Sequence, residues 1–240
     1  MKHVPNFITS LNLASGFIAI IFAANGNLIT ASWLIFFAMI FDFLDGLSAR
    51  LLKAYSEIGK ELDSLADVVS FGVAPAFIIY QLLNNSLSIY SPMIVNSAGV
   101  EASIILLFPV IMPICGALRL AKFNIDTTQV KTFKGLPIPA NALAVISIVI
   151  AGQYSHSAIF RSFIGSPVIL MVFTTILSLL MVTRIPLLSL KISNFMFKGN
   201  EGRYILVGLV LISFAIFKVM AFPLIIPLYI ISSAISLLFL

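Results

Sequence analysis

Charged residues are scarce in this chain. Only 10% of its 240 residues are Asp, Glu, Lys or Arg, and 60% are apolar, whereas a soluble domain carries about 25% charged residues. Runs of about 20 apolar residues recur along the sequence, and each is long enough to cross a bilayer as a helix. The composition excludes a soluble fold and predicts an integral membrane protein.

Cysteine and histidine are also nearly lacking. The single cysteine, Cys115, excludes a disulfide framework and a cysteine-based metal cluster. The two histidines, His3 and His156, are far apart in the sequence, which argues against a His-ligated metal site. A net charge of +5 would suit a nucleic-acid partner, but the basic residues are scattered between apolar runs, as topology signals are. No nucleic-acid partner is expected.

The apolar runs predict an all-α protein with about eight transmembrane helices. Turn-forming Asn, Gly and Pro residues separate most of the runs. The expected helices cover residues 7–24, 28–53, 60–84, 99–124, 138–152, 165–184, 203–219 and 222–240.

The distribution of Lys and Arg predicts the orientation. If the N-terminus is cytoplasmic, twelve of the fourteen basic residues fall on the cytoplasmic side, and only Arg161 and Lys218 fall outside. The opposite orientation would invert the positive-inside bias of membrane proteins. Both termini are therefore expected in the cytoplasm.

Acidic residues are concentrated in one short stretch. Six of the nine Asp and Glu residues lie within residues 42–67. Asp42 and Asp45 are at the cytoplasmic end of the second expected span, and Asp63 and Asp67 are at the start of the third. Ionised carboxylates at membrane depth are costly and normally mark a functional path.

Helical periodicity brings these four aspartates together. At about 100° per residue, each pair shares one helix face, and a tight turn between the helices would make the two faces meet. Carboxylates that close cannot all stay ionised without cations. Oxygen ligands without His or Cys favour Mg²⁺, Mn²⁺ or Ca²⁺ over zinc. Four carboxylates suit one or two such ions, the arrangement used for in-line phosphoryl displacement.

Small residues accompany the aspartates. Gly46, Ala49 and Gly59 share their faces and add no bulk there. A flat base or a diphosphate can therefore approach the backbone closely.

The combined pattern resembles the signature of the CDP-alcohol phosphotransferase family. It reads Asp42-Phe-Leu-Asp45-Gly46-Leu-Ser-Ala49-Arg50, eight residues, Gly59, three residues, Asp63, three residues, Asp67. The resemblance implies a membrane enzyme that exchanges CMP on a CDP-linked molecule for an alcohol. Metal ions would be held by the four aspartates, and the last, Asp67, would also be the catalytic base. The CDP-lipid would contact Thr9, Asn12, Gly46, Ala49, Arg50 and Gly59.

The resemblance also implies an architecture. A six-span catalytic core would cover residues 1–185, and residues 186–240 would form a cytoplasmic loop and two additional C-terminal spans. The enzyme would be a homodimer with its active site on the cytoplasmic side.

Flanking segments resemble the bacterial and archaeal branch of the family that uses serine as the acceptor. The matching segments are 5–12, 63–76, 119–124, 133–140 and 181–186. They imply CDP-diacylglycerol and L-serine as substrates, phosphatidylserine and CMP as products, and a prokaryotic cytoplasmic membrane. Serine needs a cation for its carboxylate, and Arg can grip a carboxylate with a planar fork. The expected acceptor-binding residues are Arg119, Asn124, Lys134 and Ser70.

Two alternatives stay open. The first is the same family with glycerol 3-phosphate or inositol phosphate as the acceptor, which would require a denser cationic pocket around Arg119. The second is a non-enzymatic, ion-coupled carrier whose aspartates line an ion path. A carrier would release no CMP, and its site would be expected near the bilayer midplane rather than at the cytoplasmic end.

Overall fold

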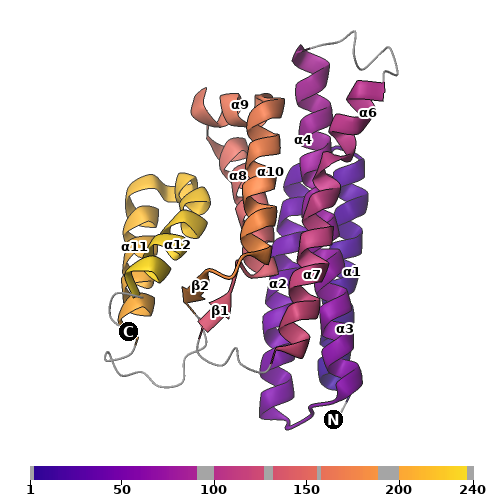
Figure 1. The fold of residues 1–240 in the computed structure, drawn as a ribbon, viewed down its shortest axis with the longest axis vertical. Helices are drawn as coiled ribbons and strands as arrows, with labels where there is room; N and C mark the ends of the chain where they lie inside the picture. Colours follow the sequence, from indigo (N-terminus) through magenta and orange to yellow (C-terminus); the bar gives the residue numbers. More distant parts are fainter. Residues whose placement is uncertain (1–2, 91–99, 127–131, 156–157, 189–199, 237–240) are drawn as a thin grey trace.

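The computed structural model describes residues 3–90, 100–126, 132–155, 158–188 and 200–236 (Figure 1). These residues form a bundle of helices with one small two-stranded ribbon near the end of the molecule at which the N-terminus lies. The N-terminal helices are α1 (Val4–Ala24), α2 (Leu28–Leu51), α3 (Glu57–Asp67), η1 (Val68–Val73) and α4 (Ala74–Tyr90).

The remaining elements follow in chain order. They are α6 (Val100–Leu107), η2 (Phe108–Val110), α7 (Ile111–Ile125), β1 (Thr132–Lys134), α8 (Ile138–Tyr154), α9 (Ala158–Gly165), α10 (Pro167–Val182), β2 (Pro186–Leu188), α11 (Glu201–Phe217), η3 (Lys218–Leu224) and α12 (Ile225–Ser236).

Helices α1 and α2 form an antiparallel hairpin. Gly26 takes a positive φ of 79° in the turn, a conformation that glycine adopts readily. The side chain of Asn27 then caps α2 by accepting a hydrogen bond of 3.2 Å from the Thr30 N–H. Between the helices, the Ser15 hydroxyl donates to the Leu34 carbonyl at 2.8 Å. The turn lies between the expected helices 7–24 and 28–53, as the sequence predicted.

The third span is one long helix that contains a stretch of π-helix. Ser56 caps its start by accepting from the Gly59 N–H at 3.0 Å, and η1 follows directly after Asp67. The expected end at residue 84 is wrong, because α4 continues to Tyr90. Leu83 and Leu87 are buried there, and their packing outweighs the weak helix propensity of the two intervening asparagines, Asn84 and Asn85.

The helices confirm the all-α membrane class. Within the described ranges, five helical segments are long and apolar enough to cross a bilayer, or six if α9 and α10, which meet at an angle of 82°, form one broken span. Helix α8, at 17 residues, is shorter than a typical span but lies among the others and is largely buried. The number of eight spans stays a prediction.

The last apolar segment, residues 201–236, folds back on itself. A Cβ atom on Gly202 in α11 would lie 2.6 Å from Ser236 Cβ in α12, so the two ends of the segment meet. The chain reverses at Lys218, whose φ is 51°. The expected helix 203–219 therefore ends two residues too late, because α11 ends at Phe217.

The ribbon was not predicted. Strand β1 pairs antiparallel with β2, with Lys134 opposite Pro186 and Thr132 opposite Leu188. Gly135 continues the pairing, since its N–H donates to the Ile185 carbonyl at 2.9 Å. The ribbon therefore joins the segment before α8 to the segment after α10.

Candidate active site

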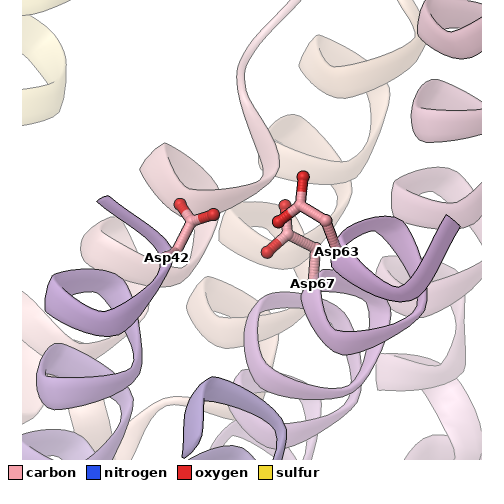
Figure 2. Close-up of side chains that lie close together, drawn as sticks. All are labelled: Asp42, Asp63 and Asp67. Atoms are coloured by element: carbon pink, nitrogen blue, oxygen red, sulfur yellow. The ribbon is translucent and has the colours of Figure 1, made fainter. Parts of the chain in front are cut away.

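Three of the four signature aspartates meet between α2 and α3. Asp42, Asp63 and Asp67 each present a carboxylate oxygen within 4.8 Å of the other two, and their side chains converge between the two helices (Figure 2). The connection from Leu52 to Ser56 is short, so the end of α2 lies beside the start of α3. The predicted meeting of the two helix faces is confirmed for these three residues.

The fourth aspartate is not a member of this triad, although it interacts electrostatically with all three of its carboxylates. Asp45 is only 5% exposed, and its carboxylate is beside the Thr9 side chain of α1. Asp45 Oδ2 is buried and has no hydrogen-bond partner among the described residues. Its assignment as a metal ligand stays a prediction.

The donor set fits a divalent metal ion. Asp63 Oδ1 is, like Asp45 Oδ2, buried without a hydrogen-bond partner in the described part of the chain. An unpaired buried carboxylate oxygen is costly, and a bound cation would remove that cost. Carboxylate oxygens are the ligands that Mg²⁺, Mn²⁺ and Ca²⁺ prefer. The triad can therefore hold a metal ion.

Helix α1 supports the triad from one side. Asn12 is fully buried, and its Nδ2 donates to Asp67 Oδ1 at 3.4 Å. Asn12 Oδ1 has no partner among the described residues, so it is a third unsatisfied oxygen in this region, after Asp45 Oδ2 and Asp63 Oδ1. The structure thus places the predicted Asn12 next to Asp67 and the predicted Thr9 next to Asp45.

The two signature glycines differ in their surroundings. A Cβ on Gly46 would meet nothing within 4 Å, so open space lies beside this position. A Cβ on Gly59 would lie 2.9 Å from Asn6 Oδ1 and from Ser56 Oγ. Gly59 therefore permits close contact between α3 and α1, whereas Gly46 leaves room for a ligand.

Arg50 and Ala49 complete the signature at the end of α2. Arg50 is exposed, and its Nε donates to the Gly46 carbonyl at 3.0 Å. Ala49 is half-buried. Their predicted contacts with the CDP-lipid stay predictions.

A cationic pocket of about 410 Å³ lies between α7, the ribbon and the end of α10. Basic side chains come from three segments, and Asp126 is the acidic residue in the lining. The lining residues are Arg119, Lys122, Phe123, Ile125, Asp126, Lys134, Met181, Val182, Thr183 and Arg184.

Arg119 connects this pocket to the triad. Its side chain is 8% exposed, interacts electrostatically with Asp67, and stacks over Phe123 at 5.8 Å. Its Nε is buried without a hydrogen-bond partner in the described ranges. A buried guanidinium with an unused N–H is suited to bind an anionic group in the pocket.

The other predicted acceptor-binding residues are placed differently. Lys134 lines the pocket and forms an ion pair with Asp126 at 3.0 Å. Asn124 is outside the lining, because its Nδ2 donates to Ser64 Oγ at 2.8 Å. Ser70 is fully buried, and its hydroxyl donates to the Asn12 carbonyl at 3.0 Å. The roles of these residues stay predictions.

Two residues near the pocket were not assigned to a site from the sequence. Arg184 was counted as a topology signal and as part of a flanking segment, although it lines the pocket. Tyr229 of α12 interacts electrostatically with Arg119. Both come from segments remote from the aspartates, so only the fold brings them together.

Known proteins are similar to this chain in sequence. The profile described as CDP-alcohol phosphatidyltransferase matches residues 2–180. A CDP-diacylglycerol–serine O-phosphatidyltransferase of Bacillus subtilis is 36% identical over 185 residues, covering 77% of this chain and 89% of the relative. A protein of the same name from Methanocaldococcus jannaschii is 39% identical over 163 residues, 68% of each chain.

A third relative has a related name. The archaetidylserine synthase of Methanothermobacter thermautotrophicus is 39% identical over 157 residues, which are 64% of this chain and 60% of the relative. The family profile covers well over half of the chain, including all four signature aspartates and the buried Arg119. The chain belongs to the CDP-alcohol phosphatidyltransferase family.

Proposed function

We propose that this protein is a phosphatidylserine synthase, which transfers the phosphatidyl group of CDP-diacylglycerol to the hydroxyl of L-serine and releases CMP. The observation that carries the proposal is the buried Arg119, which lies between the carboxylate triad and a cationic pocket. Two substrates that react with each other need adjoining sites, and the triad and the cationic pocket adjoin at Arg119. The names of the relatives from Bacillus subtilis and Methanocaldococcus jannaschii support serine as the acceptor.

The donor site is proposed at the triad. Asp42, Asp45, Asp63 and Asp67 would hold one or two ions of Mg²⁺ or Mn²⁺, with Ca²⁺ as an alternative. When bound, such ions offset the charge of the diphosphate and of the CMP leaving group. The open space at Gly46 accommodates part of the nucleotide, and the apolar helix faces accept the acyl chains from the bilayer.

Further contacts with the CDP-lipid are proposed around this opening. Thr9 and Asn12 approach it from α1, and Ala49, Arg50 and Gly59 belong to the signature itself.

Asp67 is proposed as the base. Its carboxylate accepts the proton of the serine hydroxyl while the serine oxygen attacks the phosphorus that carries the diacylglycerol. A new P–O bond to serine forms as the P–O bond to CMP breaks, and CMP leaves with the negative charge. Asn12 holds Asp67 Oδ1 at 3.4 Å, which orients the carboxylate for this step.

The acceptor site is proposed in the cationic pocket. The guanidinium of Arg119 can grip the serine carboxylate, with Lys134 at the opposite wall. Asp126 lines the same pocket and is the acidic group that suits the serine ammonium. Asn124 and Ser70 lie outside the pocket lining. They would support the acceptor site indirectly, Asn124 through its contact with α3 and Ser70 through its place in η1.

One observation favours a second candidate acceptor. Four basic side chains line the pocket (Arg119, Lys122, Lys134 and Arg184), which is more positive charge than a zwitterion needs. An acceptor with a phosphate group, such as glycerol 3-phosphate or inositol phosphate, would use this charge more fully.

We also propose a location and an assembly. The charge bias places the donor and acceptor sites at the cytoplasmic face of a prokaryotic cytoplasmic membrane. The family resemblance supports a homodimer.

The test is CMP release by the purified protein in detergent. CDP-diacylglycerol is supplied with Mg²⁺ or Mn²⁺, and L-serine, glycerol 3-phosphate or inositol phosphate is added separately. Release that depends on L-serine and stops with a chelator is the expected result. Release only with a phosphate-bearing acceptor would overturn serine as the substrate, and no release with any alcohol would favour the carrier.

A further inference from the structure

The C-terminal hairpin of α11 and α12 lies outside the segment that matches the family profile, which ends at residue 180. It is nevertheless packed into the molecule. Ile226 and Tyr229 of α12 belong to the buried core, and β2 and α8 are neighbours of this helix. In Figure 1 the hairpin stands beside α8 and above the ribbon.

Helix α12 forms hydrogen bonds with both the N–H and the carbonyl of Leu188 in β2. The Tyr229 hydroxyl donates to the Leu188 carbonyl at 2.9 Å, and the Leu188 N–H donates to Ser233 Oγ at 3.1 Å. Tyr229 and Ser233 are 4% and 1% exposed, so the two α12 residues that make these partly buried hydrogen bonds are largely removed from water. The Leu188 side chain adds a third contact, since its Cδ1 would lie 3.3 Å from a Cβ on Gly202.

The ribbon held in this way carries two cations of the pocket. Lys134 is the last residue of β1, opposite Pro186 of β2, and Arg184 precedes β2 by two residues. Both line the pocket. Tyr229 also interacts electrostatically with Arg119, the cation on the α7 side of the pocket. One buried side chain of α12 therefore touches the ribbon and lies near the opposite wall.

We propose that α12 is a positioning element of the acceptor pocket. Tyr229 and Ser233 fix β2 through Leu188 and so hold Lys134 and Arg184 at the spacing that binds the acceptor. Neither residue touches the substrates, so both are positioning residues. The proposal rests on the proposed function for the identity of the acceptor.

The test variant combines Tyr229→Phe with Ser233→Ala. These changes remove both hydroxyls but keep the buried ring and the helix. Loss of the two hydrogen bonds should raise the KM for L-serine by about tenfold. The kcat and the KM for CDP-diacylglycerol should stay within about twofold of the wild-type values, because the donor site is untouched.

The matched control is Ser232→Ala. Ser232 is as buried as Ser233, but its hydroxyl donates to the Tyr229 carbonyl within α12 at 3.1 Å and does not bond β2. Its kinetic constants should equal those of the wild type.

An unchanged KM for the acceptor in the double variant would overturn the proposal, and so would an equal rise in the control. If the double variant does not fold, each single variant is measured, and about a threefold rise is expected in each. If the wild type releases CMP only with a phosphate-bearing acceptor, the proposed function fails, and the same comparison with that acceptor tests the positioning role.

Discussion

Among the signature aspartates, Asp67 is the one that interacts with both α1 and the cationic pocket. It is 7% exposed, it accepts a hydrogen bond from Asn12, and it interacts electrostatically with Arg119 at the pocket. Asp42 and Asp63 belong to the same triad, but in the described part of the chain the interaction with Arg119 is made by Asp67. This asymmetry suits a base at Asp67 and metal ligands at the other two positions.

Asp67→Asn should therefore separate turnover from binding. The amide keeps the size of the side chain and one oxygen, but it cannot take the proton of the acceptor hydroxyl. We expect CMP release to fall by about 10²- to 10⁴-fold, the range for loss of a general base. Nucleotide and Mn²⁺ binding, measured by calorimetry, should change far less.

The control for this variant is Glu61→Gln. Glu61 is an exposed acid on the same helix and loses the same charge. Its turnover should match the wild type. Turnover of Asp67→Asn within about tenfold of the wild type would remove the base from this position.

Asp42→Asn should act on the metal instead. Asp42 is the only member of the triad from α2, so its loss opens the site on that side. We expect the midpoint of a Mn²⁺ activation curve to rise by at least about tenfold, the smallest effect typical of disturbed metal sites. Glu57→Gln, an exposed acid in the first turn of α3, should leave the midpoint unchanged. An unchanged midpoint for Asp42→Asn would count against Asp42 as a ligand.

The aspartates were predictable because short-range rules place them. Asp63 and Asp67 are one helical turn apart, and the short turn between α2 and α3 brings Asp42 close to both of them. Arg184 and Tyr229 obey no such rule. They reach the pocket through the ribbon and the C-terminal hairpin, whose positions depend on packing between segments far apart in the sequence.

At the scale of elements, the contact between α1 and η1 sets the position of Asp67. Gly16 packs directly against Ser70, and a Cβ at Gly16 would lie 2.7 Å from Ser70 Cα. Ser70 in turn donates to the Asn12 carbonyl, one turn earlier on α1. The two helices can approach this closely only because Gly16 has no side chain.

Gly16→Ala should force this contact apart. The clash is with backbone, which cannot rotate away, so we expect a loss of about 1–3 kcal/mol in stability. Turnover should fall as well, because Asn12 moves away from Asp67. Thermal unfolding in detergent measures the first effect and CMP release the second.

Gly208→Ala is the matched control. A Cβ at Gly208 in α11 would meet nothing within 4 Å. Alanine favours a helix over glycine by about 1 kcal/mol, so this variant should be equally or more stable than the wild type. Equal melting temperatures for the two variants would contradict the role given to Gly16.

The elements show where sequence patterns stop being informative. Long apolar runs predicted most helices, since a bilayer demands about 20 such residues. The π-helix after Asp67 was not predicted. The helices were predicted from apolar runs, and a π-helical stretch does not interrupt such a run. A neighbouring helix contacts its backbone, since Asn141 Nδ2 of α8 donates to the Phe71 carbonyl at 3.4 Å. The strands β1 and β2 have three residues each, too few to show an alternating pattern.

The whole molecule has two distinct ends. The N-terminus, the ribbon and the start of α3 lie toward one end, and α9 lies toward the other (Figure 1). The triad, which lies between α2 and α3, and the cationic pocket beside the ribbon lie toward the first end. This polarity agrees with a water-soluble acceptor that enters from the cytoplasm and a lipid donor that arrives through the bilayer.

The orientation of the whole molecule predicts which positions an impermeant reagent reaches. In a Cys115→Ser background, Glu57→Cys places a thiol at the exposed start of α3, and Ser162→Cys places one at the exposed surface of α9. The positive-inside bias predicts that the start of α3 faces the cytoplasm. A membrane-impermeant maleimide applied to spheroplasts should therefore label Ser162→Cys at once and Glu57→Cys only after lysis. If only Glu57→Cys were labelled from outside, the predicted topology would be inverted. Both substrate sites would then lie at the external face, away from the nucleotides of the cytoplasm.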